Sequence, residues 1–263
     1  TGCGSTGNTA SGTATTEAAV TTETGASDTS SETAANDLNI MIETPVESLD
    51  PQIGQDGTSF EVIADFTDGL MQMDAEGAPI PAIAESYELS EDGLTYTFHL
   101  RNDAKWSNGV EVTAADFVFG WQRAVDPKNA CEYSYMMSDI GQVKNAAEII
   151  AGEKDKSELG VTALDDTTLQ VELNVPVSYF LSLMYFPTFY PVNEEFYNTC
   201  ADTFASSPET TLSNGAFMLD SYEPAATTIH LSKNPYYYDA DKIALSGLHY
   251  QVIQDSQQAL MSY

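Results

Sequence analysis

Residues 84–127, AESYELSEDGLTYTFHLRNDAKWSNGVEVTAADFVFGWQRAVDP, contain the most informative pattern of this 263-residue chain. Two strand patterns, residues 85–89 and 94–101, flank the acidic connection 90–93, which has a length typical of a β-hairpin. In the second strand apolar residues alternate with polar ones, a period of two that predicts a strand with one buried face. These apolar residues are Tyr96, Phe98 and Leu100.

A capped helix is predicted after the loop that contains Asn108-Gly109, a pair that suits a turn with positive φ. Thr113 is a natural N-cap, and Asp116 three residues later can complete a capping box. Pro127 ends the helix because it disfavours the α conformation in the residue before it. Apolar residues between these limits recur at helical spacing and predict one buried stripe: Phe117, Trp121, Ala124 and Val125.

The segment closely resembles the signature region of the family 5 solute-binding proteins of bacterial ABC importers, and within them the oligopeptide-binding proteins. The residues that support the resemblance are Ala84, Asp92-Gly93, Thr95-Tyr96-Thr97-Phe98, Leu100-Arg101, Lys105-Trp106-Ser107-Asn108-Gly109, Thr113-Ala114, Asp116-Phe117 and Trp121-Gln122-Arg123-Ala124-Val125-Asp126-Pro127. The resemblance continues over residues 38–263, which correspond to the N-terminal half of the family. The second lobe of the family is therefore expected to lie outside this sequence, as in a fragment or an incomplete gene.

The resemblance implies an α/β fold, namely a periplasmic-binding-protein-like (class II) lobe with a mixed β-sheet. Residues 38–55 and 186–263 are expected to form this first ligand-binding lobe in part, and residues 56–185 an inserted, smaller α/β subdomain. The signature aromatics, including Trp106, are expected in the core of the subdomain and not at the ligand. Further predicted elements are strands at 38–42, 217–222, 227–233 and 245–253, a hairpin at 160–173, a helix opening with a capping box at Thr58 and Glu61, and helical segments at 131–137, 143–151, 177–186 and from 257 onward.

Charge is the most extreme feature of the composition: 40 acidic residues against 9 basic ones give a net charge of −31. Nucleic acid is excluded as a partner because its phosphates would be repelled, and docking on anionic lipid is disfavoured for the same reason. High solubility in an exposed compartment is the simplest interpretation, and electrostatic steering of cationic ligands is the alternative.

Residues 1–36 are mostly Thr, Ser, Gly and Ala without an aromatic residue, so they predict a disordered tether. The sequence around Cys3 resembles the end of a bacterial lipoprotein signal peptide, which implies that Cys3 is lipidated. A stray cysteine in a low-complexity end is the alternative. The lipoprotein interpretation places the protein outside the cytoplasm, in the periplasm or lipid-anchored to the outer face of the cell membrane.

Enzyme chemistry is not expected, and we predict no catalytic residue, cofactor or metal site. His99, His230 and His249 each lie in a strand pattern on its polar face. The cysteines form no short-spaced Cys/His motif, so a zinc ligand set is missing. Whether Cys131 and Cys200 form a disulfide stays open at this stage.

Binding is therefore the expected activity, and the resemblance implies two regions that contact the ligand. One follows the first strand and comprises Val46, Glu47 and Ser48; the other follows the signature helix and comprises Tyr133 and Tyr135. Plain packing is the alternative role for each tyrosine. By resemblance, a monomer would capture oligopeptides by closure of two lobes and deliver them to an ABC permease and ATPase complex. The alternatives are another solute, such as a dipeptide, a nickel complex, haem or an oligosaccharide, and a surface sensor or interaction module without a transport role.

Overall fold

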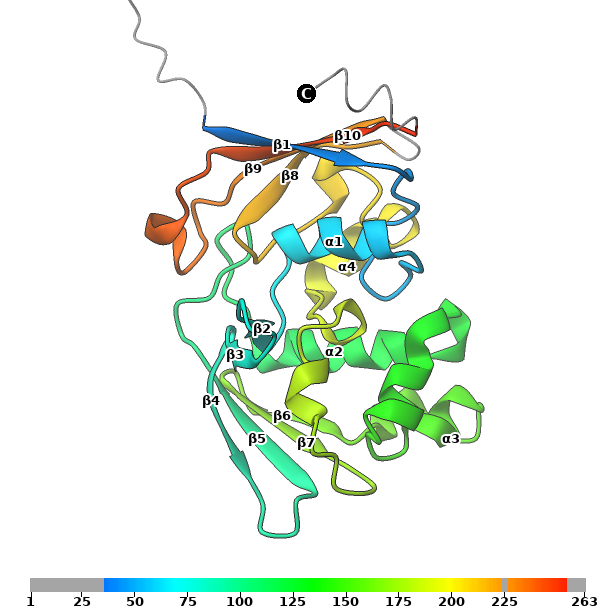
Figure 1. Ribbon diagram of the computed structural model, residues 1–263. Helices are drawn as coiled ribbons and strands as arrows, with labels where there is room; N and C mark the ends of the chain where they lie inside the picture. The colour runs from blue at the N-terminus through cyan, green and yellow to red at the C-terminus, as the bar shows by residue number, and fades with distance from the viewer. Residues whose placement is uncertain (1–35, 224–226, 255–263) are drawn as a thin grey trace, which may run out of the picture. The chain divides into compact units, whose positions relative to one another are not determined.

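The computed structural model describes residues 36–223 and 227–254. One mixed sheet has four strands, and in it the first strand of the described chain lies beside the last one (Figure 1). The strand order is β1-β10-β9-β8, with β1 parallel to β10 and the other pairs antiparallel. The strands are β1 (Asp37–Ile42), β8 (Phe217–Ser221), β9 (Thr228–Lys233) and β10 (Gly247–Val252). The predicted strands of this region are confirmed.

One face of this first sheet is covered by helix α1 (Gly57–Phe66), as Figure 1 shows. Val62, Ile63 and Phe66 of α1 are fully buried and share one hydrophobic core with the inward side chains of the strands. Helix α4 (Glu194–Cys200) follows on the same side of the sheet. The opposite face of the sheet carries polar side chains at the alternate positions, including His230 and His249.

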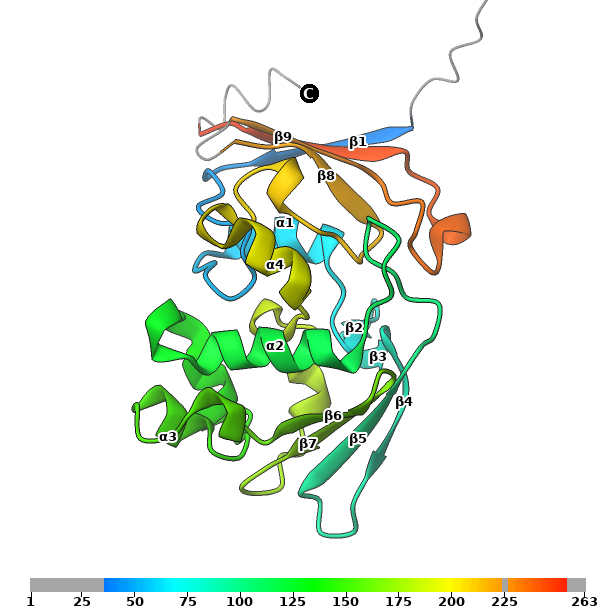
Figure 2. The ribbon, with the colours of Figure 1, turned by 180° about the vertical axis from the view of Figure 1, so that it is seen from behind.

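A second four-stranded sheet is antiparallel throughout, in the order β4-β5-β7-β6. Helix α2 (Ala114–Val125) packs on β6 and β7, as the reverse view in Figure 2 shows, and α3 (Ala146–Ile150) follows it in the chain. The strands are β4 (Ala84–Leu89), β5 (Thr95–Leu100), β6 (Val161–Asp165) and β7 (Thr168–Glu172), and a separate small pair is formed by β2 (Met71–Met73) and β3 (Pro79–Pro81).

The structure confirms the hairpin predicted from the signature segment. β4 and β5 pair antiparallel, and Gly93 in their connection has a φ of +71°, a conformation that glycine adopts without strain. The alternate apolar residues of β5 are buried, and the polar residues between them are half-exposed. The signature aromatics form the core of this sheet, because Trp106, Phe117 and Trp121 are all at most 2% exposed.

Helix α2 begins after Thr113 and ends before Asp126-Pro127, as predicted. The Asp116 carboxylate accepts the backbone N–H of Thr113 at 2.9 Å, which is the return bond of the predicted capping box. The buried indole of Trp106 donates to the same carboxylate at 3.0 Å. Asp116 therefore links the cap of the helix to the loop in front of it.

Three helical predictions were wrong in detail. Asp56, not Thr58, caps α1: its carboxylate accepts the backbone N–H of Ser59 at 2.8 Å. The apolar run 177–186 forms a single 3₁₀ turn, Phe180–Leu183, because Pro187 follows it closely and its aromatic side chains pack on separate neighbours. Residues 131–137 likewise form a 3₁₀ turn and the start of a π-helical turn.

The division into residues 38–55 plus 186–263 and an inserted subdomain 56–185 stays a prediction. The packing departs from this division at one point, since α1 falls within the predicted insertion but belongs to the core of the first sheet.

Cys131 and Cys200 are both free thiols, so the question of a disulfide between them is answered. The predicted tether, its Cys3 and the helix expected from residue 257 lie outside the described residues.

Candidate ligand-binding surface

The segment between β1 and α1 contains the first predicted contact region. Val46 is only 3% exposed as a whole residue and belongs to the core of the first sheet. The Glu47 side chain is exposed, and the backbone N–H groups of Glu47 and Ser48 donate to the Ser59 hydroxyl at 3.1 and 3.3 Å. Ser59 is in turn held by the N-cap Asp56, so the start of α1 fixes this segment. Because the whole residue is only 3% exposed, Val46 offers a ligand almost no surface.

The residues just before Val46 present free backbone. Within the described ranges, no hydrogen bond engages a backbone N–H or C=O group from Thr44 to Val46. Thr44 and Pro45 are exposed. Unpaired backbone groups next to a sheet can pair with an extended ligand, and such groups need a partner whenever water is removed from them.

The second predicted region meets the first through a cluster of four aromatic rings, which we call the aromatic cluster: Phe60, Tyr133, Tyr135 and Phe186. The Tyr133 ring lies 5.2 Å from that of Phe60 and 5.4 Å from that of Phe186, and the Tyr133 hydroxyl donates to the carbonyl of Gln55 at 3.4 Å. Tyr135 lies 5.8 Å from Tyr133 and remains 43% exposed. Tyr133 is thus largely a packing residue, and Tyr135 presents its ring to solvent.

A hollow of about 250 Å³ has Tyr185 in its wall, the residue directly before Phe186 of the aromatic cluster. The residues lining it are Ala64, Asp68, Gly69, Met71, Gln72, Met73, Tyr185 and Tyr190. Asp68 is the only acidic residue of this lining and is 7% exposed. The hollow is therefore polar at Asp68 and apolar or aromatic over much of the remaining wall.

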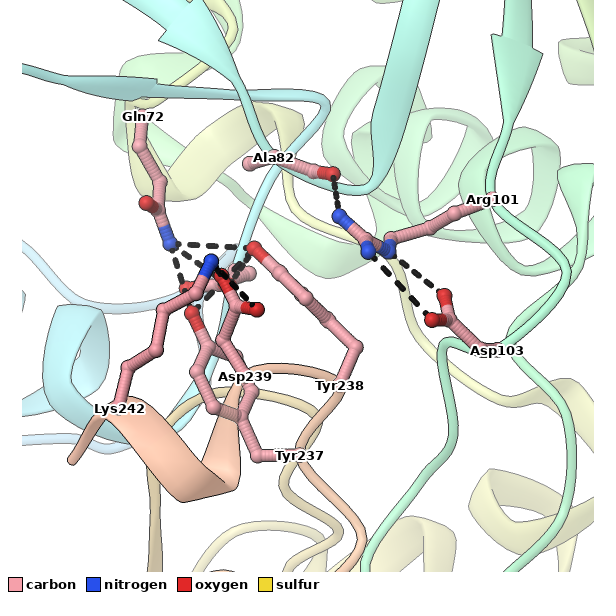
Figure 3. A network of polar contacts seen from close by, with 9 residues as sticks. Gln72, Ala82, Arg101, Asp103, Tyr237, Tyr238, Asp239 and Lys242 are labelled. Carbon is pink, nitrogen blue, oxygen red and sulfur yellow. Dashed lines mark hydrogen bonds and ion pairs between the residues drawn. The ribbon is translucent and has the colours of Figure 1, made fainter.

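Asp68 belongs to a hydrogen-bond network, part of which is drawn in Figure 3. Its Oδ2 atom accepts from Gln72 Nε2 at 2.8 Å and from the Tyr238 hydroxyl at 3.1 Å. The side chain of Asn214 bonds both backbone groups of Asp68, at 2.9 and 3.2 Å. By contrast, the Oδ1 atom accepts no hydrogen bond from the described residues and is not fully enclosed by them. Asp68 therefore lines the hollow with a carboxylate whose Oδ2 atom is held by two donors.

The environment of Asp68 favours its protonated form. Burial raises the pKa of this carboxyl to about 6, although the hydrogen bonds from Gln72 and Tyr238 oppose the shift. Arg101, from the signature segment, stacks its guanidinium 3.6 Å from the centre of the Tyr238 ring and donates to Asp103 at 2.7 Å (Figure 3). The signature segment thus reaches the hollow through Arg101 and Tyr238.

No pattern in the sequence indicated Asp68 or Gln72 as site residues. Tyr237 and Tyr238 likewise lie outside the two predicted contact regions. The network could be identified only in three dimensions, since Tyr238 and Asp68 are 170 positions apart in the sequence.

Among the described residues, none of the helices is long and apolar enough to cross a membrane.

Residues 78–263 match the sequence profile described as bacterial extracellular solute-binding proteins, family 5 Middle. The chain belongs to this family. Its α/β architecture agrees with solved structures: it superposes on Listeria monocytogenes OppA bound to peptide with a TM-score of 0.84 and 39% identity, covering 88% of this chain and 45% of that one. The substrate-binding domain of an oligopeptide ABC transporter from Bacillus anthracis gives a TM-score of 0.84 and 40% identity, covering 88% and 44%.

Curated relatives include proteins named for different ligands. The probable deoxycholate-binding periplasmic protein YgiS of Escherichia coli (strain K12) is 41% identical over 209 residues, 80% of this chain and 38% of the relative. The oligopeptide-binding protein OppA of Bacillus subtilis (strain 168) is 36% identical over 226 residues, 86% of this chain and 41% of the relative. The chain thus spans about two fifths of the length of these relatives.

Proposed function

We propose that this chain is part of the extracytoplasmic binding component of an ABC importer and that its ligands are oligopeptides. The observation that supports this most directly is the exposed and unpaired backbone of residues 44–45, which lies shortly before α1 and, through it, the aromatic cluster. Every peptide offers the same backbone donors and acceptors, so a receptor for varied peptides gains affinity by pairing with them. The names of the peptide-binding relatives agree with this proposal.

In the proposed complex the exposed Tyr135 ring covers an apolar part of the peptide, while Glu47 and Ser48 face its backbone. The hollow that contains Tyr185 receives a hydrogen-bond donor, for which the Asp68 carboxylate in its wall is suited. Two-lobe closure and delivery to a permease and ATPase belong to the same proposal. Lipidation of Cys3, a monomeric state and the absence of enzyme activity remain predictions from the sequence.

A second candidate ligand is an amphipathic steroid acid, because one relative at 41% identity is named for deoxycholate binding. The aromatic cluster suits an apolar ring system. The charge of the protein argues against it, since a net charge of −31 and the buried Asp68 both disfavour a carboxylate ligand. We therefore favour the peptide.

The deciding experiment measures binding by isothermal titration calorimetry with the complete gene product. The titrants are peptides of two to eight residues, with basic and acidic side chains, and deoxycholate. We expect a peptide to bind and Tyr135→Ala to weaken it about 10-fold, a typical loss for an aromatic contact. Tyr87→Ala is the matched control, because Tyr87 is 42% exposed against 43% for Tyr135 and lies on β4 of the second sheet.

Equal losses in the two variants would remove Tyr135 from the proposed site. Binding of deoxycholate without binding of any peptide would replace the proposal by the steroid alternative. No binding of either kind, with a signal from a metal complex or a glycan, would favour the other solutes named above.

A further inference from the structure

The outer face of the first sheet contains a group of side chains that the peptide proposal does not use. His249 on β10 and His230 on β9 are directly opposite each other, and their rings stack with centroids 4.0 Å apart. Asp37 on β1 is opposite Gly247, two residues before His249 on the same face. Three neighbouring strands therefore each present one metal-ligating side chain to one point.

We propose that Asp37, His230 and His249 form a binding site for a late first-row divalent metal ion such as Zn²⁺. One ligand atom from each of the three side chains lies within 4.8 Å of the other two. The set of two imidazoles and one carboxylate is typical of zinc, nickel and copper sites and unlike the all-oxygen sites of Ca²⁺ and Mg²⁺. Water would complete the coordination, because the three residues are partly exposed.

The surroundings of His230 resemble the outer shell of a metal site. Its Nδ1 atom lies 2.8 Å from Asp220 Oδ2, and a carboxylate at Nδ1 fixes the tautomer in which Nε2 is free to bind a metal. Gly247 leaves room at this atom, since a Cβ there would lie 3.2 Å from both His230 Nε2 and Asp37 Oδ1. These two atoms thus converge over a residue without a side chain.

The charge of the group also favours a cation. Within the described ranges, Asp37 and Asp220 lie at ion-pair distance from His249 and His230 and from no lysine or arginine. Two carboxylates therefore lie close together without a lysine or arginine beside them. A bound divalent ion would balance the charge of the two carboxylates, and His249 Nε2 and Asp37 Oδ2, 3.1 Å apart, are already close enough to share one ion.

Metal binding requires a small rearrangement. Tetrahedral Zn²⁺ with bonds of about 2.0–2.1 Å holds its ligand atoms roughly 3.4 Å apart. His249 Nε2 and Asp37 Oδ2 are already 3.1 Å apart, and the ligand atom of His230, which lies within 4.8 Å of the others, must approach them. The stacked rings must also turn until a nitrogen lone pair of each points at the ion. Both movements are open to side chains that are 27% and 44% exposed, those of His230 and His249. In the metal-bound form, β1 at the edge of the sheet would be cross-linked to β10 and β9.

The test is titration of the purified, EDTA-treated protein with Zn²⁺ by calorimetry and with Co²⁺ by visible absorption. We expect one strong site, four- or five-coordinate Co²⁺ bands without thiolate charge transfer, and no competition from excess Ca²⁺ or Mg²⁺. His249→Ala and His230→Ala should each weaken Zn²⁺ binding about 100-fold or more, and Asp220→Ala about 10-fold. His99→Ala is the matched control, because His99 lies on β5 of the second sheet and faces Glu88.

Circular dichroism of each metal-free variant shows whether it folds. The proposal is overturned if the wild type binds no Zn²⁺, if folded His230→Ala and His249→Ala variants bind it as tightly as His99→Ala does, or if Ca²⁺ displaces it. Thiolate bands in the Co²⁺ spectrum would assign the ion to a cysteine and would equally overturn the proposal.

Discussion

Asp50 and Arg123 form a buried, bidentate ion pair between the segment after β1 and the signature helix α2. The Arg123 Nη1 and Nη2 atoms donate to the two carboxylate oxygens at 3.2 and 2.7 Å, and the two residues are 8% and 4% exposed. The guanidinium also packs on the ring of Tyr197 at 4.4 Å. Among the described residues, Arg123 Nε has no hydrogen-bond partner. The pair holds the predicted ligand segment to the most recognisable helix of the chain.

Removing one member of this pair should strongly destabilise the fold, because the remaining charge stays buried without a partner. We expect Asp50→Ala to lower the free energy of unfolding by about 3–5 kcal/mol, measured in urea. The double variant Asp50→Ala/Arg123→Met should lose less than the sum of the single changes. Glu172→Ala is the control, since its 2.7 Å pair with Lys144 is nearly half exposed and is worth about 1 kcal/mol or less. Additive losses would contradict a direct coupling.

The raised pKa of Asp68 should make stability depend on pH in a defined window. Its carboxyl binds a proton more tightly in the folded state, with a pKa of about 6 against roughly 3.9 unfolded, so this stabilisation is present below pH ~4 and is lost as the pH rises to ~6. Relative to Asp68→Asn, the wild type should lose about 3 kcal/mol across that window. Urea unfolding from pH 4 to 7 measures it, with the exposed Asp241→Asn as the control. Parallel curves for wild type and Asp68→Asn would show that Asp68 does not titrate there.

Gly120 should not tolerate a side chain, although it lies inside a helix where alanine is intrinsically better. A Cβ at this position would lie 2.5 Å from the Tyr190 carbonyl oxygen, against which α2 packs. We expect Gly120→Ala to cost about 1–3 kcal/mol by overpacking. Gly57→Ala at the start of α1 meets no atom within 4 Å and should stabilise by about 0.4–1 kcal/mol. Thermal unfolding of both variants checks the prediction, which fails if the two midpoints move in the same direction.

The two tyrosines of the aromatic cluster should separate in their effect on stability. Tyr133→Ala removes contacts with Phe60 and Phe186 and should lower the free energy of unfolding by about 2–3 kcal/mol. Tyr135→Ala, with its ring half in solvent, should cost less than about 1 kcal/mol. Tyr133→Phe should be close to wild type, because the bond of its hydroxyl to Gln55 is long at 3.4 Å. A larger loss for Tyr135→Ala than for Tyr133→Ala would reverse the assigned roles.

Much of the local structure could be predicted, because the spacing of apolar residues and the N-cap of a helix depend on residues that are close together in the sequence. The alternation along β5 and the stripe along α2 each reported a buried face correctly. The start of α1 shows the limit of such reasoning. Asp56 and Thr58 are both good N-cap residues, and the outcome depends on Ser59, whose backbone and side chain both bond Asp56.

The candidate site was less predictable, because a sequence pattern reports burial and not the partner of a buried group. The Asp68–Tyr238 contact joins residues 170 positions apart, and the His249–Asp37 contact joins residues 212 apart. Val46 illustrates the converse: the resemblance assigned it to ligand contact, and the structure turns its side chain into the core.

The parallel pairing of β1 with β10 has a consequence for synthesis on the ribosome. Asp37 is paired with Gly247, some 210 residues later in the chain. At a synthesis rate of about 5–20 residues per second, on the order of 10–40 s pass between the synthesis of β1 and that of β10. During that interval the run Leu38-Asn39-Ile40-Met41-Ile42 is an unpaired apolar strand, open to pairing with other nascent chains. The acidic residues on either side of this strand would then reduce association between nascent chains by charge repulsion.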